Sequence, residues 1–142
     1  MSEVNSVGYA FFAANRFVPK QAWGAQVLAF LDSYEAAALA AASTISFFRP
    51  PKGAKWNGQG YIISDNLGNN TTLAVGIAGA TDKFGAATNH GGGSAVRTEL
   101  GKAANIDAVE YEFDGETDVI VTTAAGEGTG TIKLYMEFLM PG

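Results

Sequence analysis

Residues 131–140 read TIKLYMEFLM, and this stretch decides the fold class. Apolar and polar side chains alternate along it. The apolar side consists of Ile132, Leu134, Met136, Phe138 and Met140. The opposite side carries Lys133, Tyr135 and Glu137. An alternation with a period of two residues is typical of a β-strand that turns one face to a core and the other to water. The stretch therefore predicts a half-buried strand.

Two segments upstream of this strand carry related patterns. Residues 109–113 alternate between apolar and acidic side chains, and Asp114-Gly115, a strong two-residue turn signal, follows them. Residues 117–123 are rich in the β-branched side chains that strands favour. A glycine-rich connection at residues 126–130 then leads into the last strand, with no helix after it to make a phosphate-binding loop. Together these segments predict a three-stranded antiparallel meander.

The middle of the chain predicts further strands at residues 44–48, 54–64 and 71–77, which are rich in β-branched and aromatic residues. Pro50-Pro51 ends the first of them, because proline lacks the amide that a strand ladder needs. Asx residues and a glycine at positions 65–70 indicate a turn. Residues 78–106 are harder to interpret, and their segment 94–100 fits either a strand or a helical turn.

The segment before residue 44 leaves two alternatives open. Residues 27–31 fit a strand. Residues 32–42 are rich in alanine, the best helix former, and Asp32 with Glu35 resembles the start of a helix. The surrounding β pattern can override that local preference, so both helix and strand remain open there.

Seven or eight short strands with closely spaced turn signals predict a mostly β protein. We expect an antiparallel β-sandwich, jelly-roll-like, in one domain at residues 25–142, with room for one short helix. Residues 1–24 precede it as an N-terminal extension, either an arm or a first strand. They hold five aromatic residues without clear periodicity: Tyr9, Phe11, Phe12, Phe17 and Trp23. These five are a candidate partner interface if the segment lies on a neighbouring subunit, and core residues if it is a first strand.

The chain offers little chemistry for catalysis. It has no cysteine and one histidine, His90, for which we expect a place in a loop. No serine lies in a nucleophile-elbow sequence. The turn at residues 65–70 fails the calcium-loop pattern, because Leu67 occupies a ligand position. The sequence therefore predicts no catalytic residue, no cofactor-binding residue and no metal site, and a protein that is not an enzyme.

Charge and hydropathy also limit the classes of partner that we expect. The net charge is −5, and residues 61–142 carry four basic and eleven acidic side chains. An acidic domain binds nucleic acid poorly, because affinity there comes from neutralising phosphates. No apolar run reaches the ~20 residues that a membrane-spanning helix needs. We therefore expect neither nucleic acid nor a membrane as a partner. Trp23, Trp56 and Tyr61 could form an aromatic platform for sugars, although aromatic residues on strands are more often core.

Several short motifs occur along the chain in an order that resembles a known family. They are FRPPKGA at residues 48–54, DNLG at 65–68, TLAVGI at 72–77, ATDKF at 80–84 and DVIVTT at 118–123, before a glycine-rich turn and a final strand. This order resembles small bacteriophage virion proteins of the head decoration (capsid cement) type, over residues 44–138. The resemblance implies a β-sandwich or jelly-roll fold, and we carry over no binding residue from it.

The function that this resemblance implies is structural. We expect a non-enzymatic protein on the capsid surface of a virion, which binds the major capsid protein and stabilises the shell, as a homo-oligomer with a trimer favoured. Low charge and the aromatic N-terminal stretch favour this interpretation. Two alternatives stay open: a phage tail or fibre module, and a carbohydrate-binding β-sandwich module.

Overall fold

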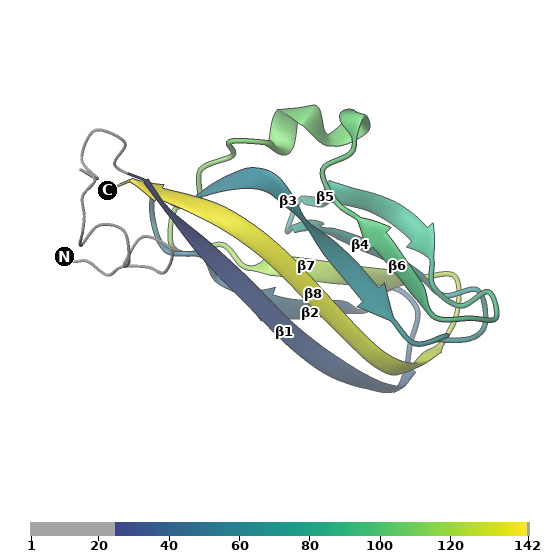
Figure 1. Ribbon diagram of the computed structural model, residues 1–142. Coiled ribbons are helices and arrows are strands. Elements are labelled where there is room, and N and C mark those ends of the chain that lie inside the picture. The colour runs from purple at the N-terminus through teal and green to yellow at the C-terminus, as the bar shows by residue number, and fades with distance from the viewer. Residues whose placement is uncertain (1–24, 142) are drawn as a thin grey trace.

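The structure, a computed structural model, describes residues 25–141. Eight strands form two four-stranded antiparallel sheets (Figure 1). Sheet A has the strand order β1-β8-β3-β6, and sheet B has the order β2-β7-β4-β5. The strands are β1 (Ala25–Leu39), β2 (Thr44–Phe48), β3 (Lys55–Ser64), β4 (Thr72–Ile77), β5 (Ala80–Asn89), β6 (Val96–Glu99), β7 (Val119–Ala124) and β8 (Gly128–Pro141). The predicted mostly β fold, an antiparallel sandwich, is confirmed.

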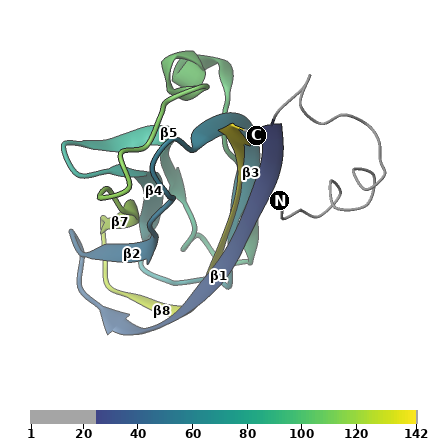
Figure 2. The same cartoon turned by 90° about the vertical axis from the view of Figure 1, so that its left-hand side faces the viewer.

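The two sheets face each other, and one short helix covers one side of the sandwich. In Figure 2, β1 and β3 of sheet A lie on one side, and β2, β7, β4 and β5 of sheet B lie on the other. The short 3-10 helix η1 (Ala103–Ala108) lies above them. Strands β5 and β6, together with η1, account for most of residues 78–106, where the sequence pattern was ambiguous.

The core lies between the sheets and is strongly aromatic. Four large side chains are fully or almost fully buried: Trp56, Phe84, Phe113 and Phe138. The Trp56 and Phe84 rings meet edge to face with centroids 4.9 Å apart, and Phe138 meets Phe113 in the same way at 5.4 Å. The predicted inward face of β8 is confirmed, because its residues 132, 134, 136 and 138 are fully buried.

The predicted meander is wrong. Strands β7 and β8 belong to different sheets, so the glycine-rich connection between them crosses the sandwich edge and does not close a hairpin. Of all consecutive strands in the described chain, only β4 and β5 are neighbours in one sheet. Residues 109–113 are not a strand either, because Glu110 has a φ of 76° and leaves the extended conformation. Hydrogen bonds to the backbone of Ala54 and Trp56 hold this loop instead.

The alanine-rich segment after Asp32 is a strand as far as Leu39. It pairs with β8 from Ala25↔Pro141 to Ala36↔Gly130. Leu28 and Phe30 pack against the core, and Ala36 is buried within it. Burial and a long ladder with β8 therefore override the local helix preference of alanine.

Candidate interaction surface

Two of the aromatic residues that the sequence singled out lie in the described part of the chain. Trp56 is completely buried and donates from Nε1 to the carbonyl of Gln59 at 3.1 Å. Tyr61 lies half-buried on the outer face of sheet A. The other candidates, Tyr9, Phe11, Phe12, Phe17 and Trp23, lie outside the described residues, so their assignment to a partner interface stays a prediction.

An aromatic cluster occupies the outer face of sheet A. Tyr61 on β3 and Tyr135 on β8 are register partners, and their rings stack with centroids 5.2 Å apart. The Arg97 guanidinium lies 4.0 Å above the Tyr61 ring. Because β6 and β8 flank β3 on opposite sides, Arg97 and Tyr135 hold Tyr61 between them. We call Tyr61, Arg97, Tyr135 and Glu137 the tyrosine cluster.

Two hydrogen bonds to Glu137 hold the tyrosine cluster in place. The Tyr135 hydroxyl donates to Glu137 Oε2 at 2.5 Å, and Asn57 Nδ2 donates to Glu137 Oε1 at 3.1 Å. The bond to this carboxylate is the main reason why the pKa of Tyr135 rises to about 12. Tyrosine and arginine are over-represented among residues that carry binding energy in protein interfaces. Side chains already held in place also lose less entropy when a partner covers them.

An exposed apolar strip continues the cluster onto β1. Leu31 is 62% exposed and is the register partner of Tyr135, which in turn pairs with Tyr61. Val27, four residues before Leu31 and on the same face of β1, is 46% exposed. The row Leu31–Tyr135–Tyr61 thus crosses three strands of sheet A. An apolar and aromatic row of this kind can bury surface against another protein.

The charges around this row are balanced. Sheet A presents an equal number of basic and acidic side chains at the outward positions of its strands: Glu35, Lys55, Arg97, Glu99, Lys133 and Glu137. The whole chain, in contrast, carries a net charge of −5. A mixed polar rim around an apolar centre is the usual anatomy of a protein interface. Repulsion between acidic proteins is therefore weaker at this face than elsewhere on the chain.

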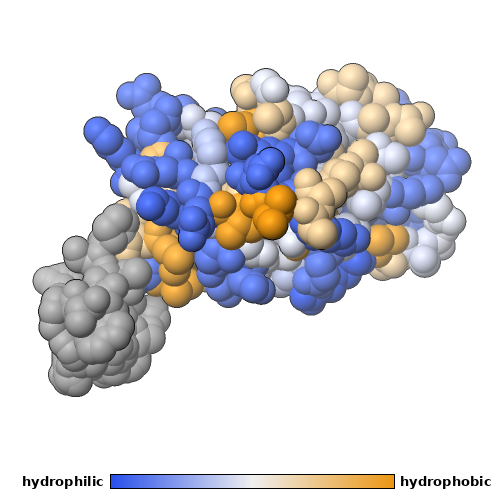
Figure 3. Space-filling model, turned by 90° about the horizontal axis from the view of Figure 1, so that it is seen from above, coloured by the Kyte–Doolittle hydropathy of each residue, from blue (hydrophilic) through white to orange (hydrophobic). Residues whose placement is uncertain are grey.

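The sandwich end that carries η1 is different in character. Seen from above, the surface shows hydrophobic patches separated by hydrophilic residues (Figure 3). Ile106 in η1 is the most exposed large hydrophobic residue among those described, at 70%. It lies in a helix of six residues, whereas Leu31 is one member of a row across several strands.

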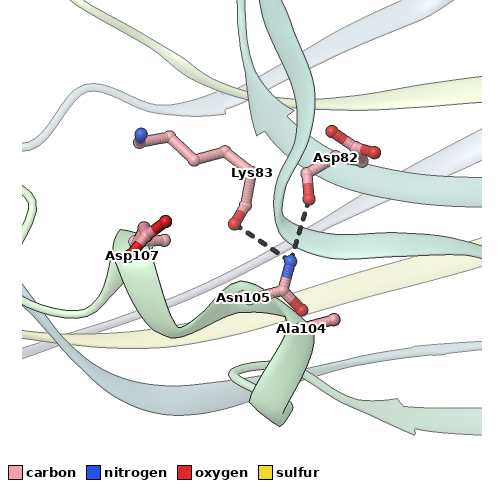
Figure 4. Close-up of a pocket in the computed structure, with 6 residues that line it drawn as sticks. Asp82, Lys83, Ala104, Asn105 and Asp107 are labelled. Atoms are coloured by element: carbon pink, nitrogen blue, oxygen red, sulfur yellow. Dashed lines mark hydrogen bonds between the residues drawn. The ribbon is translucent and has the colours of Figure 1, made fainter.

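The depression between β5 and η1 has a volume of about 200 Å³ and is a structural joint (Figure 4). Asn105 Nδ2 donates to the backbone carbonyls of Asp82 and Lys83, at 3.1 and 3.2 Å. Lys83 turns its ammonium group to the Tyr111 ring, 4.5 Å from its centroid. Pockets for small ligands are usually larger, about 300–1,000 Å³. These contacts fasten η1 to β5.

His90 lies in the connection between β5 and β6, as predicted, and is completely buried there in a chain of hydrogen bonds. The Ser64 hydroxyl oxygen lies 2.8 Å from the Asp65 carbonyl oxygen and 2.8 Å from His90 Nδ1. When the hydroxyl donates to the carbonyl, it accepts from Nδ1. The other ring nitrogen, Nε2, then accepts from Thr98 Oγ1 at 3.1 Å. Ser64 and His90 are both buried, so a substrate has no access to this pair.

The acidic run at residues 110–118 does not form a catalytic pair. Asp114 Oδ1 accepts from the Glu116 amide at 2.8 Å and from Thr117 Oγ1 at 2.9 Å, and these bonds lower the pKa of Asp114. Asp118 accepts from Arg49 Nε at 2.7 Å, which lowers the pKa of Asp118. These two carboxylates therefore have structural partners. Within residues 25–141, no group of three His, Asp or Glu residues is placed to hold a metal ion. Nor does that range contain a helix with the length and apolar character to cross a membrane.

Burial of His90 predicts a pH dependence of stability. Desolvation lowers the pKa of His90 below its ordinary value of 6.5. The unfolded chain therefore binds a proton at a higher pH than the folded chain, and the free energy of unfolding falls as the pH falls below 6.5. The slope from this one group is at most about 1.4 kcal/mol per pH unit.

Urea denaturation of the parent and of His90→Gln, at about pH 7.5 and about pH 5.5, measures this contribution. We expect the parent to lose more unfolding free energy between the two pH values than the variant does. Equal losses would contradict a neutral, buried His90.

Comparisons with known proteins give one informative similarity. No protein-family model matches the chain, and no curated protein matches it. A chain of the cyanophage Pam1 capsid asymmetric unit is similar in structure, with a TM-score of 0.64 and 22% identity, over 99% of this chain and 100% of that chain. A chain from the disulfide-linked pili of Bacillus endospore appendages covers 82% of this chain and 89% of its own at 12% identity, and its TM-score of 0.31 is too low for any argument. The chain thus shares its fold with a component of a phage capsid unit.

Proposed function

We propose that this chain is a non-enzymatic structural protein of a bacteriophage particle, located in the virion, where it binds the outside of the capsid shell and stabilises it. The single observation that carries the proposal is the similarity in fold to a chain of the cyanophage Pam1 capsid asymmetric unit. That similarity covers both chains almost completely, so it relates two chains of similar length. We also infer from the strand orders of the two sheets that the sandwich is a jelly roll.

The mechanism we propose is mechanical. A decoration protein sits across joints between subunits of the shell, with the major capsid protein as its partner, and buries surface there. Stable interfaces bury roughly 1,200–2,000 Å² in total. If the protein binds the expanded shell and not the unexpanded one, binding stabilises the expanded shell by mass action. The charge-balanced outer face of sheet A, with Leu31 and the tyrosine cluster, is the described surface that best fits a protein partner.

Residues 1–24 complete the proposed interface. We propose that they form an arm ahead of the domain at residues 25–142, and that the arm contacts a partner through its five aromatic residues: Tyr9, Phe11, Phe12, Phe17 and Trp23. We further propose that the protein is a homotrimer. A trimer presents several copies of each contact surface at once, which raises the overall affinity without new contacts.

Of the three aromatic residues considered for sugar binding, Trp23 lies outside the described residues, and the other two do not favour the carbohydrate-binding alternative. It requires an exposed aromatic ring with a free face, and Trp56 is completely buried. Tyr61 is partly exposed, but Arg97 and Tyr135 flank its ring from opposite sides. A sugar would have to displace one of them. The tail or fibre alternative differs from decoration chiefly in the number of copies in each particle.

Copy number in purified particles tests the proposal. We expect quantitative mass spectrometry of the phage that encodes this chain to find it at a fixed ratio to the major capsid protein, in many copies per particle. A few copies per particle would favour a tail or fibre module. Absence from the particles would overturn the proposal.

A further inference from the structure

Among residues 25–141, strand β1 has an open edge. It is an end strand of sheet A, with 15 residues, and within that range it pairs with β8 on one side only. Edge strands in native proteins are usually protected by charged side chains, by proline or by being short. Residues 25–31 of β1 contain no charged residue and no proline. This half of β1 therefore has the features of a strand that another chain covers.

Hydrogen bonding identifies the residues that face this open edge. The Ser33 amide donates to Asp32 Oδ1 at 2.8 Å, so this amide points away from β8. Backbone groups of alternate residues in a strand point to the same side, so those of Val27, Ala29 and Leu31 face the open edge as well. Within residues 25–141, no hydrogen bond beyond the β1–β8 ladder involves the backbone of these three residues. At Ser33, the side chain of Asp32 occupies the amide that faces this edge, so the open stretch ends there.

We infer that residues 27–31 form an acceptor edge for a β-strand contributed by a second copy of this chain, from the uncharged aromatic stretch at residues 4–15. The inference rests on the proposed function, since it names the contact within the proposed oligomer. Residues 4–15 read VNSVGYAFFAAN and carry no charge, like the acceptor edge. The main chain supplies the hydrogen bonds of such strand addition, and side chains at alternate positions supply the specificity.

Charge favours the same pairing. Residues 1–24 contain Glu3, Arg16 and Lys20 and are net basic. Strand β1 contains two acidic residues, Asp32 and Glu35, and no basic one. The added strand also brings aromatic side chains beside exposed Val27 and Leu31. Apolar burial and attraction between opposite charges therefore act in the same direction.

The position of Pro19 favours a second copy over the chain's own segment. To return along its own β1, the chain would have to turn near Gly24, and Pro19 would then fall among the first pairs of the hairpin. Proline has no amide to donate and interrupts a ladder there. In a neighbouring copy, residues 16–24 serve as a linker that spans up to about 30 Å. Pro19 then lies outside the paired stretch.

Cross-linking between two different chains tests this arrangement. The sequence has no cysteine, so single cysteines can be placed without interference. One chain carries Tyr9→Cys, Phe11→Cys or Phe12→Cys, and a second chain of different length, through a tag, carries Leu31→Cys. After the two chains are mixed and mildly oxidised, we expect a disulfide-linked product that contains one of each. Ile106→Cys, equally exposed but in η1, is the matched control and should give at least tenfold less of that product.

A complementary experiment introduces two positive charges at the open edge of β1. We expect the combined change Val27→Lys and Leu31→Lys to raise the dissociation constant of the oligomer at least tenfold in sedimentation equilibrium, and Ile106→Lys to leave it unchanged. Circular dichroism of each variant checks that the sandwich is folded.

Three results would overturn the inference. One is linkage to Leu31→Cys at no more than the level of the Ile106→Cys control. Another is a disulfide that forms only within a single chain carrying both Phe11→Cys and Leu31→Cys. The third is an oligomer that the two lysines leave intact. If any of these occurs while the protein is abundant in particles, the inference fails and the proposed function stands. If the chains link as expected but particles lack the protein, the proposed function fails alone.

Discussion

Replacing Phe138 with alanine is expected to lower the free energy of unfolding by about 3–5 kcal/mol. Phe138 is completely buried on β8. Its ring meets those of Phe30, Phe48 and Phe113, with centroids 5.5, 6.4 and 5.4 Å away and near-perpendicular planes. These partners belong to β1, β2 and the loop before β7, so one side chain joins both sheets and a connection. Its removal leaves a cavity that none of the three can fill alone.

Chemical denaturation monitored by circular dichroism measures this cost. Domains of this size are stable by only about 5–15 kcal/mol, so the alanine variant can be partly unfolded. Phe138→Leu, which keeps part of the volume, should then show a smaller loss in the same direction. Ile106→Ala is the exposed control and should stay within about 0.5 kcal/mol of the parent. A loss at Phe138→Ala no greater than that of the control would contradict the placement of this ring in the core.

Gly91→Ala is expected to cost about 1–3 kcal/mol, whereas the same change at its neighbour Gly92 should cost almost nothing. A Cβ atom at Gly91 would lie 2.3 Å from the carbonyl oxygen of Gly68 and 2.6 Å from the amide nitrogen of Thr71. Both atoms belong to the backbone, so a side-chain rotation cannot relieve the clash. A Cβ atom at Gly92 would be 3.4 Å from Asn89 Nδ2, which is an ordinary contact.

Thermal unfolding of the two variants side by side measures the difference between these glycines. The pair is a stringent control, because both residues lie in the same connection between β5 and β6. Equal shifts in Tm would show that the β5–β6 connection does not press against residues 68–71, contrary to the hydrogen bond from the Leu67 amide to the His90 carbonyl at 2.9 Å.

Patterns that depend on one strand alone could be predicted from the sequence. The alternation at residues 131–140 identified the buried face of β8, because each side chain's orientation follows from the period of the strand. Strand β2 was predicted at its observed bounds from its β-branched and aromatic residues and from the two prolines that follow it. The turn at residues 65–70 was also predictable. Asn66 Oδ1 accepts from the Gly68 amide at 3.1 Å, the local bond that favours Asx residues there.

Patterns that depend on distant partners could not be predicted. The short connection between β7 and β8 has the composition of a hairpin. Its path is set by contacts far away in sequence, since Asn69 Nδ2 donates to the Glu127 carbonyl at 2.8 Å and the Gly126 backbone lies against Asn69. The alternation at residues 109–113 correctly indicated that Phe113 is buried, but a period of two does not reveal the left-handed conformation of Glu110.

The candidate interaction surface was only partly visible in the sequence. Tyr135 was assigned to the polar side of its strand, and Tyr61 was noted as an aromatic residue that could be exposed. Neither pattern indicates that they stack, because their strands are neighbours in the sheet but far apart in the chain. Leu31 was missed as a surface residue, since the extent of β1 depends on its pairing with β8. Once the strand is known, its odd-numbered residues from Val27 to Leu31 fall on the outer face.

Binding to capsid shells tests the central claim most directly. The purified full-length chain is sedimented with expanded and with unexpanded capsids that lack it, over a range of concentrations. We predict saturable binding at a fixed ratio to the major capsid protein on expanded shells and none on unexpanded shells, because a protein that stabilises the mature shell must bind that state better. Absence of binding to both kinds of shell would contradict the proposal that this chain is a capsid decoration protein.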